Sequence, residues 1–417
     1  MIPCSTTSFA VNGRTYTPPA RPVAVICLDG SADEYLDAAL ARGRMPHLAR
    51  ISVSGWRGLA RGAMPSFTNV NNSSIVTGVP PSVHGIGGNF FYDTASGQEV
   101  MMNSAAFLRA ETLFPAAQRA GRKVAVVTAK EKLRDIFAHG LIREGGIAFS
   151  SERAGQAAPA THGVGDVESL VGPTPPIYSG EASIYVLRAG VRLLAAGRAD
   201  FLYLSTTDFM QHKFGPEAPE ALDFYEAIDA ELGALLAAGA VVGLTADHGM
   251  NAKQLPDGSP NVIFLETELT ERFGPGFRVI LPITDPYVVH HGALGSFAQV
   301  HLPAGTGASL EIAEWLRSRA GMTEVLTRDT AARLMELPPD RMGDLVVCSG
   351  RNVVLGRTPA YHDLKAIEGG LRSHGGRYEE MVPFVLSEPL SPAYRSRAQG
   401  DPRNFDIFEF TVNGTRA

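Results

Sequence analysis

Short, mostly apolar runs recur along the chain and predict the buried strands of a largely parallel sheet. Predicted helices follow several of these strands, and a strand followed by a helix is the unit of a doubly wound α/β sheet. The predicted strands are 23–28, 58–61, 123–128, 201–204, 240–244 and a late strand at 381–386. The predicted helices are 31–43, with Ser31 and Glu34 spaced as a capping box, then 73–77 and 217–238.

The pattern changes after residue 265, where a compact strand-helix-strand-helix-strand series begins. Its members are 297–302, 308–319, 323–326, 330–335 and 344–348. We therefore predict a core α/β domain over 1–265, an inserted α/β cap subdomain over 266–368, and a return to the core over 369–417. Residues 155–180, rich in Gly, Pro, Ala and Thr, are predicted to form a long loop.

Polar residues that can bind metal ions follow four of the predicted core strands. They are Asp29, Thr68, Asp208 and the pair Asp247 and His248. In open α/β sheets, ligands bind beyond the carboxyl ends of the strands, so parallel strands would bring these residues to one rim. Taken alone, Asp247-His248 is more typical of a polar turn that closes a strand, and the recurrence at other strand ends favours a site.

Two further residues extend the set. His212 lies four residues after Asp208, which places both on one face of a helix, although a solvent-facing pair has the same spacing. His374 lies before Gly375 and Gly376, where the backbone can approach an ion closely, although it could equally be an ordinary loop histidine.

Oxygen and imidazole ligands together suit zinc. The division that best satisfies two zinc ions is Asp29, Thr68, Asp247 and His248 on one, with Asp208, His212 and His374 on the other. Two ions about 3.5–4 Å apart can hold the attacking and departing oxygens of phosphoryl transfer. Thr68 is then the natural nucleophile, and its alternative role is that of a helix N-cap.

The amino-acid composition limits the kinds of partner and the cellular compartment expected for this protein. Among 417 residues, Lys and Arg number 37 and Asp and Glu 43, which gives a net charge of −6 and no basic block for nucleic acid. Three distant cysteines favour a reducing compartment and exclude a Cys-based zinc site. The N-terminus lacks signal-peptide character, and the apolar run 232–246 is too short to span a bilayer. We expect a cytoplasmic protein with no membrane partner.

Several motifs resemble the nucleotide pyrophosphatase/phosphodiesterase branch of the alkaline phosphatase superfamily. They are Phe67-Thr68-Asn69, the segment 74–78 and the segment 81–85. The segments 87–91, 128–132 and 206–213 resemble the phosphonoacetate hydrolases within that branch. The resemblance covers nearly the whole chain. It departs at Val70, where diesterase relatives often carry proline, and the sulfatase cysteine signature is absent.

The resemblance implies an alkaline phosphatase-like fold and a di-zinc hydrolase that converts phosphonoacetate to acetate and phosphate through a phosphothreonine at Thr68. Asn89 would donate a hydrogen bond to the phosphonate, and Lys130 and Lys132 would hold the carboxylate. Otherwise Asn89 is a turn residue and the lysines are a solvated pair. His290 and His291 could touch the carboxylate, although a structural role is favoured, and a homodimer is considered possible.

Two other functions stay open. A zinc phosphodiesterase or nucleotide pyrophosphatase would use the same metals and nucleophile, with a hydrophobic slot for a base in place of the paired lysines. A non-catalytic zinc protein would leave no room for substrate. Removing Thr68 separates this last class from an enzyme, because an enzyme would lose turnover and keep its metal.

Overall fold

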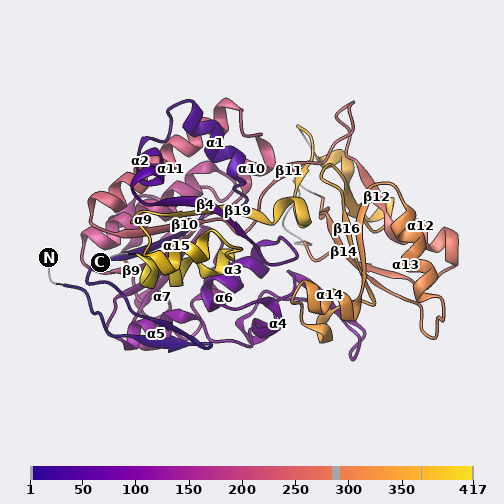
Figure 1. Cartoon of the computed structure of the whole chain (residues 1–417), viewed down its shortest axis with the longest axis horizontal. Helices are drawn as coiled ribbons and strands as arrows, with labels where there is room; N and C mark the ends of the chain where they lie inside the picture. Colours follow the sequence, from indigo (N-terminus) through magenta and orange to yellow (C-terminus); the bar gives the residue numbers. More distant parts are fainter. Residues whose placement is uncertain (1–2, 284–291, 368, 416–417) are drawn as a thin grey trace.

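The computed structural model describes residues 3–283, 292–367 and 369–415. The chain forms two lobes, with both termini on the side of the first lobe that faces away from the second (Figure 1). Each lobe is built around its own sheet. None of the helices in these described ranges combines the length and the apolar character that crossing a membrane requires.

The first lobe is organised around a seven-stranded sheet in the order β4-β19-β10-β3-β9-β7-β8. Its strands are β3 (Val23–Cys27), β4 (Trp56–Arg61), β7 (Val124–Thr128), β8 (Ile147–Ser150), β9 (Phe201–Ser205), β10 (Val241–Thr245) and β19 (Met381–Leu386). Strand β19 runs antiparallel to both of its neighbours, and the other strands are parallel to one another. The predicted mostly parallel α/β sheet is confirmed, and it includes the late strand.

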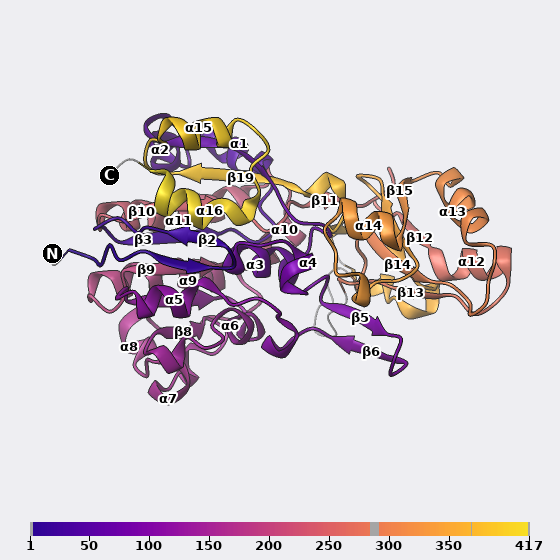
Figure 2. The same cartoon turned by 60° about the horizontal axis from the view of Figure 1, so that its bottom comes forward.

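Helices cover both faces of this sheet, as expected for strands buried on both sides (Figure 2). One face packs against α1 (Asp33–Ala41), α2 (Pro46–Ser54), α9 (Gly180–Ala195) and α11 (Pro219–Ala237). The other packs against α3 (Thr68–Thr77), α5 (Leu113–Arg119), α6 (Glu131–Phe137) and α16 (Ile407–Glu409). Helices α2, α5, α6, α9 and α16 are additions to the predicted set. The predicted long loop contains the short helices α7 (Pro159–His162) and α8 (Val167–Val171).

Two predictions about helix starts are wrong. Ser31 is not a helix cap, because α1 begins after Ala32 and the Ser31 hydroxyl lies 2.6 Å from the Tyr225 hydroxyl. Helix α3 begins at Thr68, five residues before the predicted start. All ten residues of α3 are buried although most are polar, so the segment lacks the apolar stripe by which helices are recognised.

The second lobe has an antiparallel sheet in the order β13-β14-β16-β15. Its elements are α12 (Leu265–Phe273), β13 (Arg278–Ile280), β14 (Phe297–His301), α13 (Ser309–Ser318), β15 (Met322–Thr327), α14 (Arg328–Leu334) and β16 (Leu345–Ser349). The predicted five-element series matches β14 to β16 to within two residues at each end. Strand β12 (Val262–Phe264) pairs with β17 (Val354–Gly356). The domain boundaries drawn from the sequence stay predictions.

The lobes share a packed boundary beside the predicted nucleophile. Ala63, Met64, Phe67 and Val70 of the first lobe belong to the apolar core of the second. The hairpin of β5 (Phe90–Asp93) and β6 (Gln98–Met101) extends along the second lobe (Figure 2). The short strands β11 (Asn251–Ala252) and β18 (Arg372–Ser373) pair at the same boundary. The segment that carries Thr68 is therefore held from both sides.

Candidate metal centre

Three adjacent strands deliver the acidic residues of the site to one edge of the sheet. Asp29 is the second residue after β3, and Asp208 is the third after β9. Asp247 and His248 are the second and third after β10. The four side chains are buried, with Asp29, Asp247 and His248 fully inaccessible. The prediction that parallel strand ends would bring these residues together agrees with this arrangement.

Gly30 makes the close approach of Asp29 and Asp208 feasible. Its φ is +70°, and a Cβ atom built there would lie 2.8 Å from the Cβ of Asp208. Any larger residue would push the two carboxylates apart. The Asp29 backbone is also anchored, because its N–H donates to the Thr206 hydroxyl over 2.9 Å.

A first group able to hold a metal ion consists of Asp208, His212 and His374. His212 lies on α10 (Phe209–Lys213), whose N-cap is Asp208, and its Nε2 is 2.9 Å from Asp208 Oδ2. His374 Nε2 is 3.8 Å from the same oxygen. The helical spacing inferred from the sequence therefore places Asp208 and His212 on one face, and the fold brings in His374 from a distant loop.

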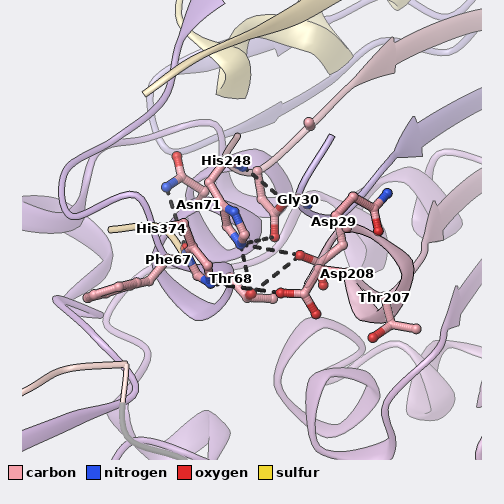
Figure 3. A network of polar contacts seen from close by, with 12 residues as sticks. Asp29, Gly30, Phe67, Thr68, Asn71, Thr207, Asp208, His248 and His374 are labelled. Carbon is pink, nitrogen blue, oxygen red and sulfur yellow. Dashed lines mark hydrogen bonds and ion pairs between the residues drawn. The ribbon is translucent and has the colours of Figure 1, made fainter. Parts of the chain in front are cut away.

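A second group consists of Asp29, Asp208 and His248, so Asp208 belongs to both (Figure 3). His248 Nε2 is 3.3 Å from Asp29 Oδ1 and 3.8 Å from Asp247 Oδ2. The Asp247 carboxylate accepts hydrogen bonds from Gly30 N, His248 N and Asn72 Nδ2. Asp208 is therefore common to both groups. Asp247 lies beside the second group, and both of its carboxylate oxygens already accept hydrogen bonds.

The three histidines share one hydrogen-bond arrangement. Each Nδ1 lies within 2.8 Å of a backbone carbonyl oxygen, which belongs to Arg372 for His212, to Gly249 for His248 and to Ser66 for His374. A carbonyl oxygen only accepts, so Nδ1 carries the proton and donates in each case. When each ring is neutral, its Nε2 therefore directs a lone pair at the cluster, and this is the form of imidazole that binds a metal ion.

Burial and neighbouring charges shift the pKa values of the ionisable groups in the cluster. Burial, together with the charges of Asp208 and Asp247, raises the pKa of Asp29 well above its usual range. Burial would also raise the pKa of Asp208, but the neighbouring Lys130 and His212 hold it well below. Burial opposes protonation of His248, yet the charges of Asp247 and Asp29 raise its pKa to about 10. A concentration of negative charge in a buried site is what a bound cation would offset.

The donor set fits divalent metal ions. Asp29 Oδ2 is buried and has no hydrogen-bond partner within the described residues, an arrangement that costs free energy unless a cation is its partner. Carboxylate oxygens and imidazole nitrogens together are ligands typical of zinc. Within the described ranges, two groups could therefore hold metal ions, and they share Asp208.

Thr68 lies against the second group. Its Oγ1 is 3.3 Å from His248 Nε2 and 3.5 Å from Asp29 Oδ1. It is the first residue of α3, after the N-cap Phe67, so its hydroxyl is not itself the cap. The helix N-terminus adds local positive potential where an anion would approach. Gly375, with φ +116°, packs on the Phe67 ring, where a Cβ would lie 2.4 Å from Phe67 Cε1.

Of Asn89, Lys130 and Lys132, which the sequence analysis assigns to substrate binding, Lys130 is the one with a recorded contact to the cluster. Lys130, the N-cap residue of α6, has its Nζ 3.5 Å from Asp208 Oδ1, and Lys132 is half-buried in the first turn of that helix. Asn89 is buried beside the second lobe, where its N–H donates to Pro282 O and its Oδ1 has no hydrogen-bond partner among the described residues. His290 and His291 lie outside the described residues.

One residue of the site, Asn72, was not predicted from the sequence. Asn72 is fully buried on α3, one turn after Thr68, and its Nδ2 donates to Asp247 Oδ2 over 2.9 Å and to Thr68 O over 3.1 Å. Its Oδ1 accepts from the Tyr203 and Ser205 hydroxyls. The spacing of four from Thr68 was the available signal, and it was missed because the helix was predicted to start later.

Comparison with known proteins gives matches over most of the chain. The family model described as type I phosphodiesterase/nucleotide pyrophosphatase matches residues 23–368. Phosphonoacetate hydrolase from Sinorhizobium meliloti 1021, in complex with phosphonoformate, is 49% identical with a TM-score of 0.93 over 98% of this chain and 99% of that chain. Its complex with phosphonoacetate gives 48% and 0.92 over the same shares. Murine ectonucleotide pyrophosphatase/phosphodiesterase 5, at 17% identity and TM-score 0.61 over 95% and 96%, shares the fold.

Proposed function

The chain belongs to the type I phosphodiesterase/nucleotide pyrophosphatase family, and from that premise we propose that it hydrolyses phosphonoacetate to acetate and phosphate. The observation that carries this proposal is the position of Lys130, whose ammonium lies 3.5 Å from a carboxylate of the metal cluster. A cation there suits a substrate with a second negative charge. Near-complete coverage by a 49% identical phosphonoacetate hydrolase supports the same substrate.

The residues proposed to hold two zinc ions are those of the sequence prediction: Asp29, Thr68, Asp208, His212, Asp247, His248 and His374. This part of the proposal is supported by the buried donor set and by Asp29 Oδ2, which has no hydrogen-bond partner among the described residues. When bound, the metal ions would supply Lewis-acid stabilisation of charge on the phosphonate oxygens.

In the proposed reaction, the Thr68 hydroxyl loses its proton and Oγ1 forms a bond to phosphorus as the carbon–phosphorus bond breaks. The electron pair of that bond passes to the methylene carbon, which takes up a proton and leaves as acetate. Water then cleaves the phosphothreonine and releases phosphate. Burial of Thr68, which is 8% exposed, supports this role because it limits competing access of water to the nucleophile.

Two lysines and an asparagine would orient the substrate. Lys130 and Lys132 on α6 would bind the carboxylate and stabilise the negative charge that develops on the acetate in the transition state. Asn89 would use its amide N–H to donate to a phosphonate oxygen. The bond from Asn89 N to Pro282 O and the burial of this residue support a fixed position for its side chain.

The setting and assembly form part of the same proposal. Three free cysteines, two of them buried, support a reducing, cytoplasmic compartment. A homodimer remains a prediction. The alternative of a zinc phosphodiesterase or nucleotide pyrophosphatase shares the family, the metals and the nucleophile, so the test must separate the two substrates.

The test compares Lys130→Met and Lys132→Met with the control Lys123→Met. Lys123 is exposed at the opposite end of β7, where its Nζ donates to Gly197 O. We expect each site variant to lower kcat/KM for phosphonoacetate about 100-fold, as loss of a charge-assisted contact to the substrate predicts. Turnover of a nitrophenyl phosphodiester should change much less, and the control should match the wild type. Equal losses on both substrates would contradict the carboxylate clamp.

A further inference from the structure

Behind the metal cluster lies an ion pair from which solvent is entirely excluded. Lys253 Nζ is 2.9 Å from Glu379 Oε1, and both side chains are 0% exposed. Burial lowers the pKa of Lys253 against the opposing charge of Glu379. Burying two charges costs desolvation free energy, and an apolar pair of similar volume often gives equal or greater stability. Stability alone is therefore a weak account of this pair.

Glu379 makes hydrogen bonds to both histidine-bearing loops. Its Oε2 accepts from Gly376 N over 3.0 Å, two residues after His374. Its carbonyl oxygen accepts from Gly249 N over 2.8 Å, one residue after His248. Its Oε1 accepts from Asn251 Nδ2 over 2.6 Å as well as from Lys253. One residue thus connects the backbones of two loops that are far apart in the sequence.

The histidines on these loops are in direct contact. The rings of His248 and His374 stack with centroids 3.5 Å apart and an interplanar angle of 5° (Figure 3). His248 belongs to one candidate metal group and His374 to the other. A small movement of either loop would change the separation of the two Nε2 atoms, and with it the geometry offered to both ions.

The pair also connects the loops to the second lobe. Lys253 Nζ donates to Arg351 O over 2.7 Å, and Arg351 Nε donates to Asn251 Oδ1 over 2.9 Å. His374 O accepts from Ser296 N, which lies just before β14. Both the ion pair and the histidine loop are therefore bonded to the same neighbouring lobe.

We propose that Glu379, held in place by Lys253, is a positioning residue that sets the separation of His248 and His374 for metal binding. This inference rests on the metal site of the proposed function. Removing the Glu379 carboxylate weakens zinc binding by a larger factor than the loss of a buried pair elsewhere. The residue itself touches neither substrate nor metal and acts through Gly249 and Gly376.

The experiment measures the zinc affinity of the folded, full-length protein by competition with a colorimetric chelator, with Tm recorded for each variant. Glu379→Gln is expected to bind zinc at least about tenfold more weakly, in the range seen when outer-sphere partners of metal ligands are removed. The double variant Lys253→Met/Glu379→Met replaces the charges with apolar side chains of similar length. It should be more stable than Lys253→Met alone and still bind zinc weakly, because Gly376 N has lost its acceptor.

The matched control is Arg122→Met. Arg122 is a second fully buried cation, 2.7 Å from Asp200 and remote from the cluster. This variant should lower Tm and leave zinc affinity within about twofold of the wild type. Wild-type zinc affinity in folded Glu379→Gln and in the double variant would overturn the positioning role. A wild type that binds two zinc ions without hydrolysing phosphonoacetate would refute the proposed function and leave this inference standing.

Discussion

Removal of the Asn72 amide tests whether a buried network holds Asp247 in place. The Asn72 side chain makes four hydrogen bonds. Its Nδ2 donates to Asp247 Oδ2 and to Thr68 O. Its Oδ1 accepts from the Tyr203 hydroxyl over 2.6 Å and from the Ser205 hydroxyl over 3.0 Å. Asn72 is 0% exposed, so none of these partners has water as a ready substitute. Asn72→Ala removes the amide donor to the Asp247 carboxylate and the acceptor that the two hydroxyls share.

The expected loss follows from the kinds of bond removed. The bond to the Asp247 carboxylate contributes about 2 kcal/mol and each of the three neutral bonds about 1 kcal/mol, which gives about 5 kcal/mol. Water entering the vacated space would offset part of this. We expect Asn72→Ala to lower the free energy of unfolding by about 3–5 kcal/mol, measured by urea denaturation of the metal-free protein with an unchanged m-value.

Asn404→Ala is the matched control. Asn404 is also fully buried, and its Nδ2 donates to the neutral acceptors Asn71 Oδ1 and Ala246 O, so a loss of about 2 kcal/mol is expected. Asn72→Asp should be more stable at pH 5 than at pH 8, relative to the wild type, because only a protonated carboxyl can donate to Asp247. If Asn72→Ala loses no more stability than Asn404→Ala, the network does not hold Asp247 in place.

Two further predictions concern pH and metal. Burial lowers the pKa of His84 to about 3, and its unfolded value is about 6.5, so the unfolded state binds more protons between these values. Stability should fall by up to about 1.4 kcal/mol per pH unit as pH drops below about 6, and an unchanged slope in His84→Gln would contradict this. Zinc at about 1,000 times its dissociation constant should add about 4 kcal/mol to the free energy of unfolding. A Tm that does not change when chelator is added to the zinc-loaded protein would refute the metal site.

The acidic half of the site follows from local sequence and sheet geometry. Asp29, Asp208 and Asp247 end parallel strands, whose carboxyl ends must share an edge, and His212 follows Asp208 at helical spacing. The second-lobe series was predicted almost to the residue because its helices and strands have clear periodicity. These features depend on short stretches of chain, each of which carries its own pattern.

The remainder depends on contacts between distant segments. His374 reaches the cluster through its bond to Ser66 O, 308 residues away, and Glu379 meets Lys253 across 126 residues. Helix α3 escaped detection at its start because its buried residues are mostly polar and are satisfied by partners elsewhere, as Asn72 is by Tyr203. A local sequence pattern cannot predict such pairings, because they form only when the fold is complete.

The most direct measurement is the release of acetate and phosphate from phosphonoacetate by the zinc-loaded protein, with Thr68→Ala beside it and zinc content determined for both. We expect equimolar products from the wild type. In Thr68→Ala we expect turnover reduced at least about 1,000-fold with two zinc ions retained, because the nucleophile is lost and the other proposed metal ligands remain. A wild type that cleaves a nitrophenyl phosphodiester and leaves phosphonoacetate intact would contradict the proposed function.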